Sequence, residues 1–149
     1  MKEAHYIENY GRDGATVIAH GLRDDPGSLY VPAADVADPA KAAAIRAYVA
    51  LWGRALAWLN AHPQEWAKGY FVEEQGLNLE DARYVVESYG KFEVPGDWTE
   101  AIERQQATIG LLAKATSQKV LNAPDLFDRR FEHVAAEGFV AETASAKAE

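Results

Sequence analysis

The sequence predicts a mainly α-helical protein with one or two short strands. Every strongly periodic segment after Asp38 repeats its apolar residues at intervals of three and four, which is the helical period. Only residues 15–19 and 29–33 have strand character, and two short strands do not form an independent sheet. The chain has 149 residues and no long linker, so we predict one domain over residues 1–136. The sequence of 137–149 predicts a frayed or disordered tail.

The two candidate strands lie in the N-terminal part of the chain. Residues 15–19 read ATVIA and are bounded by Gly14 and Gly21. A DDPG run at 24–27 then predicts a turn. Residues 29–33 read LYVPA, and the proline at position 32 excludes this second segment from a central position in a sheet.

A long helix is predicted from Asp38 to the His62-Pro63 break, followed by a second helix that ends at Gly76. Asp38 is a good N-cap, and the proline that follows suits the first helical position. Two apolar stripes run along the long helix, one of Ile45, Val49, Trp52, Leu56 and Leu59 and one of Tyr48, Leu51, Ala55 and Trp58. Together they form a wide apolar face, which predicts that this helix packs in a globular core.

Three more helices are predicted after Gly76. Asn78 can cap a helix that ends at Gly90. Asp97 and Glu100 resemble a capping box, and the helix that they open runs to about Ser117. A proline at position 124 opens the last predicted helix.

Composition and charge exclude some classes of function. The net charge is -8, which argues against nonspecific nucleic-acid binding but leaves small anionic ligands open. There is no cysteine, so disulfides and thiol chemistry are excluded. No window is long and apolar enough for a membrane span, and the N-terminal residues contain no apolar signal-peptide core. The cellular compartment therefore cannot be predicted.

No pattern of residues predicts catalysis. The histidines, which are His5, His20, His62 and His133, lack metal-ligand spacing. The serines lack a nucleophile-elbow context, and neither a dinucleotide-binding nor a P-loop motif occurs. The paired carboxylates suit helix ends and solvated faces. We therefore expect a protein that is not an enzyme and has no metal site, cofactor or catalytic residue.

An ordered set of motifs resembles one known family. GATVIAHG at 14–21 is followed by the long helix, and HPQEWAK then begins at His62. The runs GLNLEDARYVVESY, VPGDWTEAIERQQ and APDLFDRRF follow in order. Over roughly residues 9–134 this order resembles the C-terminal region of ABC-transporter substrate-binding proteins for aliphatic sulfonates, taurine and nitrate. The residues that match its helix-and-break pattern are Ala55, Trp58, His62, Pro63 and Glu65.

The resemblance implies the C-terminal part of a type 2 periplasmic-binding-protein α/β fold. It implies a non-catalytic solute-binding component, or a truncated remnant of one, of an ABC importer, with a permease as partner. Family members are longer and are periplasmic or lipid-anchored, so the resemblance implies an apparently truncated domain that binds its ligand weakly. An alternative is a helical self-association or interaction module that has lost ligand binding. An enzyme related to the thiamine-precursor synthesis proteins, which share this general fold, is a third alternative.

The resemblance also implies a candidate ligand site. Residues 22–30 correspond to the family segment near the ligand cleft, where Arg23, Ser28 and Tyr30 would donate hydrogen bonds to a sulfonate or nitrate oxygen. Arginine suits a bidentate contact with an oxyanion. The alternative is that Arg23 pairs with a neighbouring aspartate in an exposed turn and that Tyr30 packs on a helix.

The apolar face of the long helix predicts association. The stripe of Tyr48, Trp52, Leu56 and Leu59 has more apolar area than the other predicted helices can cover. Exposed apolar patches and open strand edges promote association, and a symmetric dimer is the commonest closed arrangement. We therefore expect a homodimer.

Overall fold

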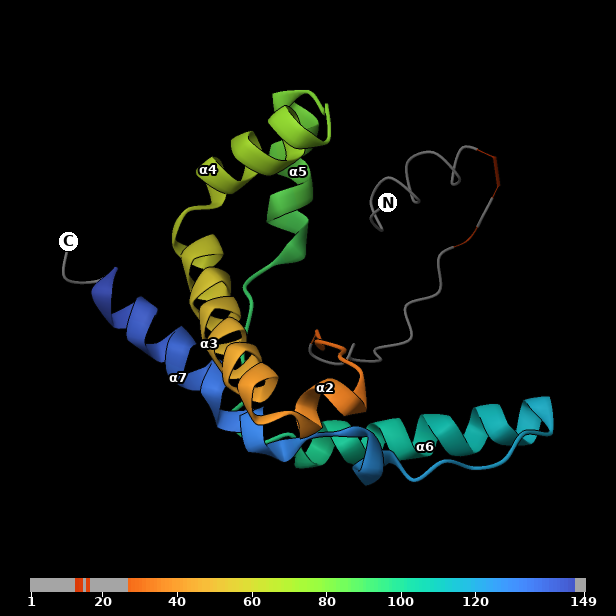
Figure 1. Cartoon of the computed structure of the whole chain (residues 1–149). Helices are drawn as coiled ribbons and strands as arrows, with labels where there is room; N and C mark the ends of the chain where they lie inside the picture. The colour runs from red at the N-terminus through yellow and green to blue at the C-terminus, as the bar shows by residue number, and fades with distance from the viewer. Residues whose placement is uncertain (1–12, 15, 17–26, 147–149) are drawn as a thin grey trace. The chain divides into compact units, whose positions relative to one another are not determined.

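The computed structural model describes residues 13–14, 16 and 27–146, and these residues are mainly helical (Figure 1). The elements in order are α2 (Ala33–Ala37), α3 (Pro39–Ala61), α4 (Pro63–Trp66), the π-helix η1 (Ala67–Glu74), α5 (Leu79–Tyr89), α6 (Thr99–Thr116), the 3-10 helices η2 (Ala123–Leu126) and η3 (Arg129–Phe131), and α7 (Glu132–Ser145). The prediction of a mainly α protein is confirmed. No strand occurs in the described residues.

The described residues form two compact units, each described here by itself. Residues 62–91 belong to the first, and residues 27–61 and 92–146 belong to the second. In the first unit η1 packs against α5 around a small core of Ala67, Phe71, Ala82 and Val86. The π-helical hydrogen bond from Gln75 N to Tyr70 O is 3.0 Å long. Gly76, at φ +70°, ends this segment, because a positive φ suits glycine.

Helix α5 begins and ends where the sequence predicts. Asn78 has extended backbone angles, and its side-chain oxygen accepts a 2.9 Å hydrogen bond from the backbone N–H of Asp81. Gly90 follows the helix at φ +67°. These are the cap residues on which the prediction was based, so local signals fix where α5 begins and ends.

The second unit is built on close packing between α3 and α7. A Cβ atom added at Gly53 would overlap the backbone carbonyl of Ala135, and one added at Gly138 would overlap the carbonyl of Ala50. The two helix backbones therefore approach at positions where glycine is required. Val49, Val134 and Ala135 are buried at this contact.

Helix α3 begins as predicted, but its apolar face is only partly covered. Asp38 Oδ1 accepts hydrogen bonds from Ala40 N at 2.9 Å and Lys41 N at 3.3 Å, so Asp38 is the N-cap. The stripe that contains Val49 is buried or half-buried. The other stripe is exposed, with Tyr48 59% and Leu51 58% exposed. The prediction that the whole face packs in a core is therefore wrong for this stripe, because α7 packs on the other side of the helix.

The second predicted strand is absent. Residues 27–32 have no regular structure, and Ala33 already belongs to α2. The carbonyl of Pro32 accepts hydrogen bonds from Asp35 N at 3.0 Å and Val36 N at 3.4 Å, which starts a helical turn in place of a strand. The prediction of a strand at 29–33 is therefore wrong. The predicted strand at 15–19 lies outside the described residues, except for Thr16.

The C-terminal part differs from the prediction at both ends of its last helix. Pro124 lies in η2, and a second 3-10 helix, η3, separates it from α7, which begins only at Glu132. Where the sequence predicts a frayed tail from residue 137, the structure is helical to Ser145. The contact at Gly138 and the 3.0 Å ion pair from Arg54 Nε to Glu142 Oε2 tie these residues to α3. Among the described helices, none has the length and apolar composition needed to cross a membrane.

Candidate functional site

The predicted anion-binding residues lie in or before an irregular loop, residues 27–32. Arg23 falls outside the described residues, whereas Ser28 and Tyr30 lie in the loop and are exposed. Tyr30 is 94% exposed, so the alternative in which it packs on a helix is wrong. A Cβ at Gly27 would lie 3.9 Å from the ring of Trp52, which places the start of the loop beside α3. The structure thus puts Ser28 and Tyr30 on one open loop.

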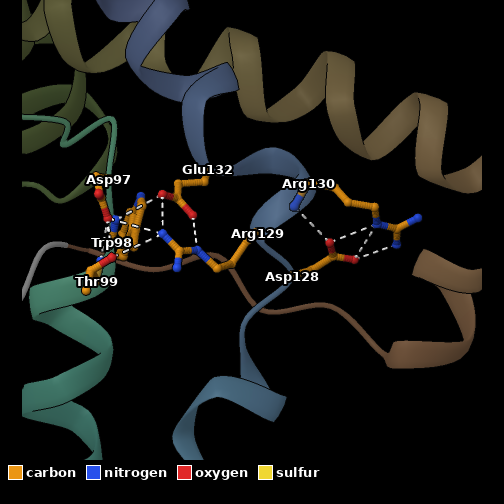
Figure 2. A network of polar contacts seen from close by, with 7 residues as sticks. All are labelled: Asp97, Trp98, Thr99, Asp128, Arg129, Arg130 and Glu132. Carbon is orange, nitrogen blue, oxygen red and sulfur yellow. Dashed lines mark hydrogen bonds and ion pairs between the residues drawn. The ribbon is translucent and has the colours of Figure 1, made fainter.

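A polar network joins the starts of α6 and α7 (Figure 2). Asp97 Oδ1 accepts hydrogen bonds from the backbone N of Thr99 at 2.7 Å and from its hydroxyl at 2.6 Å. Arg129 Nη2 donates to Asp97 Oδ1 and to the Thr99 hydroxyl, both at 3.2 Å. Asp97, two residues before α6, is therefore bound to Arg129, which lies in η3 shortly before α7.

Glu132 completes this network and corrects the predicted capping box. It accepts hydrogen bonds from Arg129 Nε and, at 2.8 Å, from Arg129 Nη2. It also accepts from Trp98 N at 3.3 Å, at the start of α6. Glu100, which was predicted to fold back onto this helix start, instead lies 3.5 Å from Arg104 on the next turn. A carboxylate from α7 thus accepts a backbone hydrogen bond at the start of α6, where the sequence predicts a contact from Glu100.

The electrostatics of the network stabilise its charged form. Hydrogen bonds from the Thr99 side chain and backbone, with the nearby Arg129 charge, lower the pKa of Asp97. The hydrogen bond from Arg129 is the main cause that lowers the pKa of Glu132. The pKa of Arg129 is raised, chiefly by its hydrogen bond to Glu132. Because both carboxylates engage this guanidinium, the network is suited to joining two helices.

A second arginine ties η3 to α2. Arg130 Nη2 donates to the carbonyl of Val36 at 3.1 Å, and its Nε donates to Asp128 Oδ1 at 2.9 Å. The hydrogen bond from Arg130 lowers the pKa of Asp128. Within the described ranges, no three His, Cys, Asp or Glu side chains are arranged to hold a metal ion.

The exposed stripe of α3 is the second candidate site. We call Tyr48, Leu51, Ala55 and Trp58 the α3 stripe. These residues follow one another at intervals of three, four and three, so they lie on one face of the helix. They face away from the α7 contact at Val49 and Gly53. No carboxylate occurs from Pro39 to Ala61. The stripe therefore presents apolar surface that carries no negative charge.

Comparison with known proteins gives no role to the predicted ligand residues or to the α3 stripe. No known protein family, curated protein or solved structure matches this chain.

Proposed function

We propose that this chain forms the C-terminal helical part of a non-catalytic solute-binding component of an ABC importer for aliphatic sulfonates, taurine or nitrate. The observation that supports this proposal is the helix break at the central motif. Helix α3 ends at Ala61, Pro63 takes the first position of α4, and Glu65 lies in its first turn. His62, Pro63 and Glu65 thus lie at the helix break that the family pattern requires, and Ala55 and Trp58 lie in the preceding helix.

The ligand in this proposal is a small oxyanion held by Arg23, Ser28 and Tyr30. Ser28 and Tyr30 are exposed on the loop, so high affinity would require a second wall that closes over them. A ligand that loses half of its contacts loses most of its affinity, because each factor of ten corresponds to about 1.4 kcal/mol. We therefore expect this chain alone to bind taurine, alkanesulfonates and nitrate weakly or not at all.

The DNA sequence upstream of Met1 tests this proposal. An in-frame continuation that encodes an export signal and an α/β lobe would support a solute-binding component. An upstream stop codon, with a separate start signal for this chain, would contradict it.

Calorimetry tests the proposed ligand site, because micromolar binding of taurine to this chain would refute the expected need for a second wall. The variant Arg23→Ala would then show whether Arg23 makes the anion contact.

The second candidate function is a helical self-association module. The exposure of the α3 stripe favours self-association, because the free energy falls when a partner covers an apolar helix face. Light scattering during gel filtration tests this candidate. A mass near twice 16.4 kDa is expected, and a monomer at every concentration would contradict it.

A further inference from the structure

We propose that the α3 stripe binds the same stripe of a second copy of this chain, with the two α3 helices antiparallel. This inference rests on the second proposed function, self-association, and names its partner and geometry. Helix α3 has apolar side chains on the side that packs on α7 and also on the opposite side. A helix with apolar side chains on two opposite sides is typical of a more buried position, and α7 covers only one of these sides.

The spacing of the stripe favours a helix as its partner. Positions 48, 51, 55 and 58 alternate steps of three and four, which is the pattern of a seam between two supercoiled helices. If the twofold axis crosses the stripe at the level of position 53 along the helix, Leu51 faces Ala55 of the partner subunit. Tyr48 faces Trp58 of the partner subunit. A large side chain then lies opposite a small one, and an aromatic side chain lies opposite an aromatic one. The stripe is therefore complementary to itself in the antiparallel register.

The available apolar area suffices for a specific dimer. The stripe alone, counted on two copies, offers roughly 800 Å², since each aromatic side chain carries roughly 150–250 Å². The loop 27–32 starts beside Trp52, one helical turn from Tyr48 and Ala55, and leads into α2, which packs on α3. The exposed apolar residues of this loop are Leu29, Tyr30 and Val31. If the dimer also covers these residues, the buried area reaches on the order of 1,500 Å², which is the size of a specific interface.

Charge does not oppose this contact. The charged residues of α3 are Lys41, Arg46 and Arg54. Lys41 pairs with Asp35, Arg54 pairs with Glu142, and Arg46 Nη1 donates to the carbonyl of Arg130 at 3.5 Å. Two of the three charges are thus neutralised within the same chain, and the stripe itself contains none.

The first test compares two matched substitutions of exposed leucines. Leu51→Glu introduces a carboxylate into the stripe, whereas Leu111→Glu introduces one on α6, where the leucine is 72% exposed. Both positions are exposed, so both variants should fold, and circular dichroism verifies this. Sedimentation equilibrium should give a dimer dissociation constant raised by about tenfold or more for Leu51→Glu, and nearly unchanged for Leu111→Glu.

The second test uses the absence of cysteine from the chain. Leu51→Cys and Ala55→Cys chains are mixed under oxidising conditions, and mass spectrometry identifies the cross-linked pairs. The antiparallel register predicts that the mixed 51–55 disulfide forms in preference to either symmetric one, because a disulfide requires closely opposed Cα atoms. A parallel arrangement would give the symmetric pairs.

The outcomes separate this inference from the function on which it rests. A monomer at every concentration overturns both. A dimer that Leu51→Glu does not weaken overturns the inference and leaves self-association standing through another surface. A dimer that Leu51→Glu weakens but that cross-links symmetrically overturns the antiparallel register. Weakening by Leu51→Glu together with the mixed disulfide supports the whole proposal.

Discussion

Two helices of the second unit are held in different ways. Helix α3 packs against α7 so closely that backbone meets backbone at Gly53 and Gly138. Helix α6 has the returning segment 117–126 beside it (Figure 1), and polar side chains fix both its start and this segment. The difference shows that one unit can join one helix pair by close backbone packing and fix the start and the flanking segment of another helix by hydrogen bonds. The two kinds of contact should therefore respond to different perturbations.

The largest expected effect on the free energy of unfolding comes from adding a methyl group at the α3–α7 contact. Gly53→Ala forces a Cβ into the carbonyl of Ala135, so the free energy of unfolding should fall by about 2–3 kcal/mol. Gly110→Ala is the matched control in α6, where an added Cβ meets nothing within 4 Å. Its unfolding free energy should rise by up to about 1 kcal/mol, because alanine favours the helix. Urea unfolding followed by circular dichroism measures both, and equal shifts would contradict the close approach.

The helix boundaries show what the sequence could predict. Asp38, Asn78 and Gly90 act through hydrogen bonds and backbone angles within a few residues, so the sequence contains the information directly. The proline at position 124 misled the prediction, because its neighbour Ala123 donates a 2.7 Å hydrogen bond to Gln106 and lies in a 3-10 turn. Whether a local signal starts a long helix depends on such distant partners.

The long-range contacts could not be predicted in the same way. The sequence identified Asp97 as a cap residue but gave no reason to join it to Arg129 or Glu132, which are distant in the chain. A signal was present at Gly53, because a glycine within a helix costs about 1 kcal/mol relative to alanine and therefore often marks close packing. Of the predicted ligand residues, Ser28 and Tyr30 lie on a loop whose surroundings no local pattern specifies.

An intermediate effect on the free energy of unfolding is expected from a substitution in the polar network of Asp97, Arg129 and Glu132. Folding lowers the pKa of Asp97 and of Glu132. Their stabilising contribution is therefore fully present above their unfolded pKa values, near 4, and is lost as the pH falls through the lower folded values. Glu132→Gln should lower the free energy of unfolding by about 1 kcal/mol at neutral pH and make the loss of stability in acid shallower.

Thermal unfolding measured between neutral pH and about pH 3 checks this prediction. Part of the acid sensitivity should remain in Glu132→Gln, because Asp97 and Asp128 also have lowered pKa values. Glu100→Gln is the control, since Glu100 forms an exposed ion pair with Arg104 that should contribute little. If the unfolding temperature of Glu132→Gln falls with pH in parallel with that of the unsubstituted chain, this carboxylate has no role in the network.

The smallest effect on global stability is expected at the contact between α6 and its returning segment. Gln106 Oε1 accepts a hydrogen bond from Ala123 N at 2.7 Å, and its Nε2 donates to Leu121 O at 3.1 Å. Gln106→Ala removes both, yet the segment can open locally and expose its backbone to water, so the free energy of unfolding should fall by less than about 1 kcal/mol. Amide hydrogen exchange at Ala123 should instead become much faster. Gln105→Ala, on the adjacent face of α6, should leave that exchange rate unchanged; equal rates in the two variants would mean that Gln106 does not hold the segment.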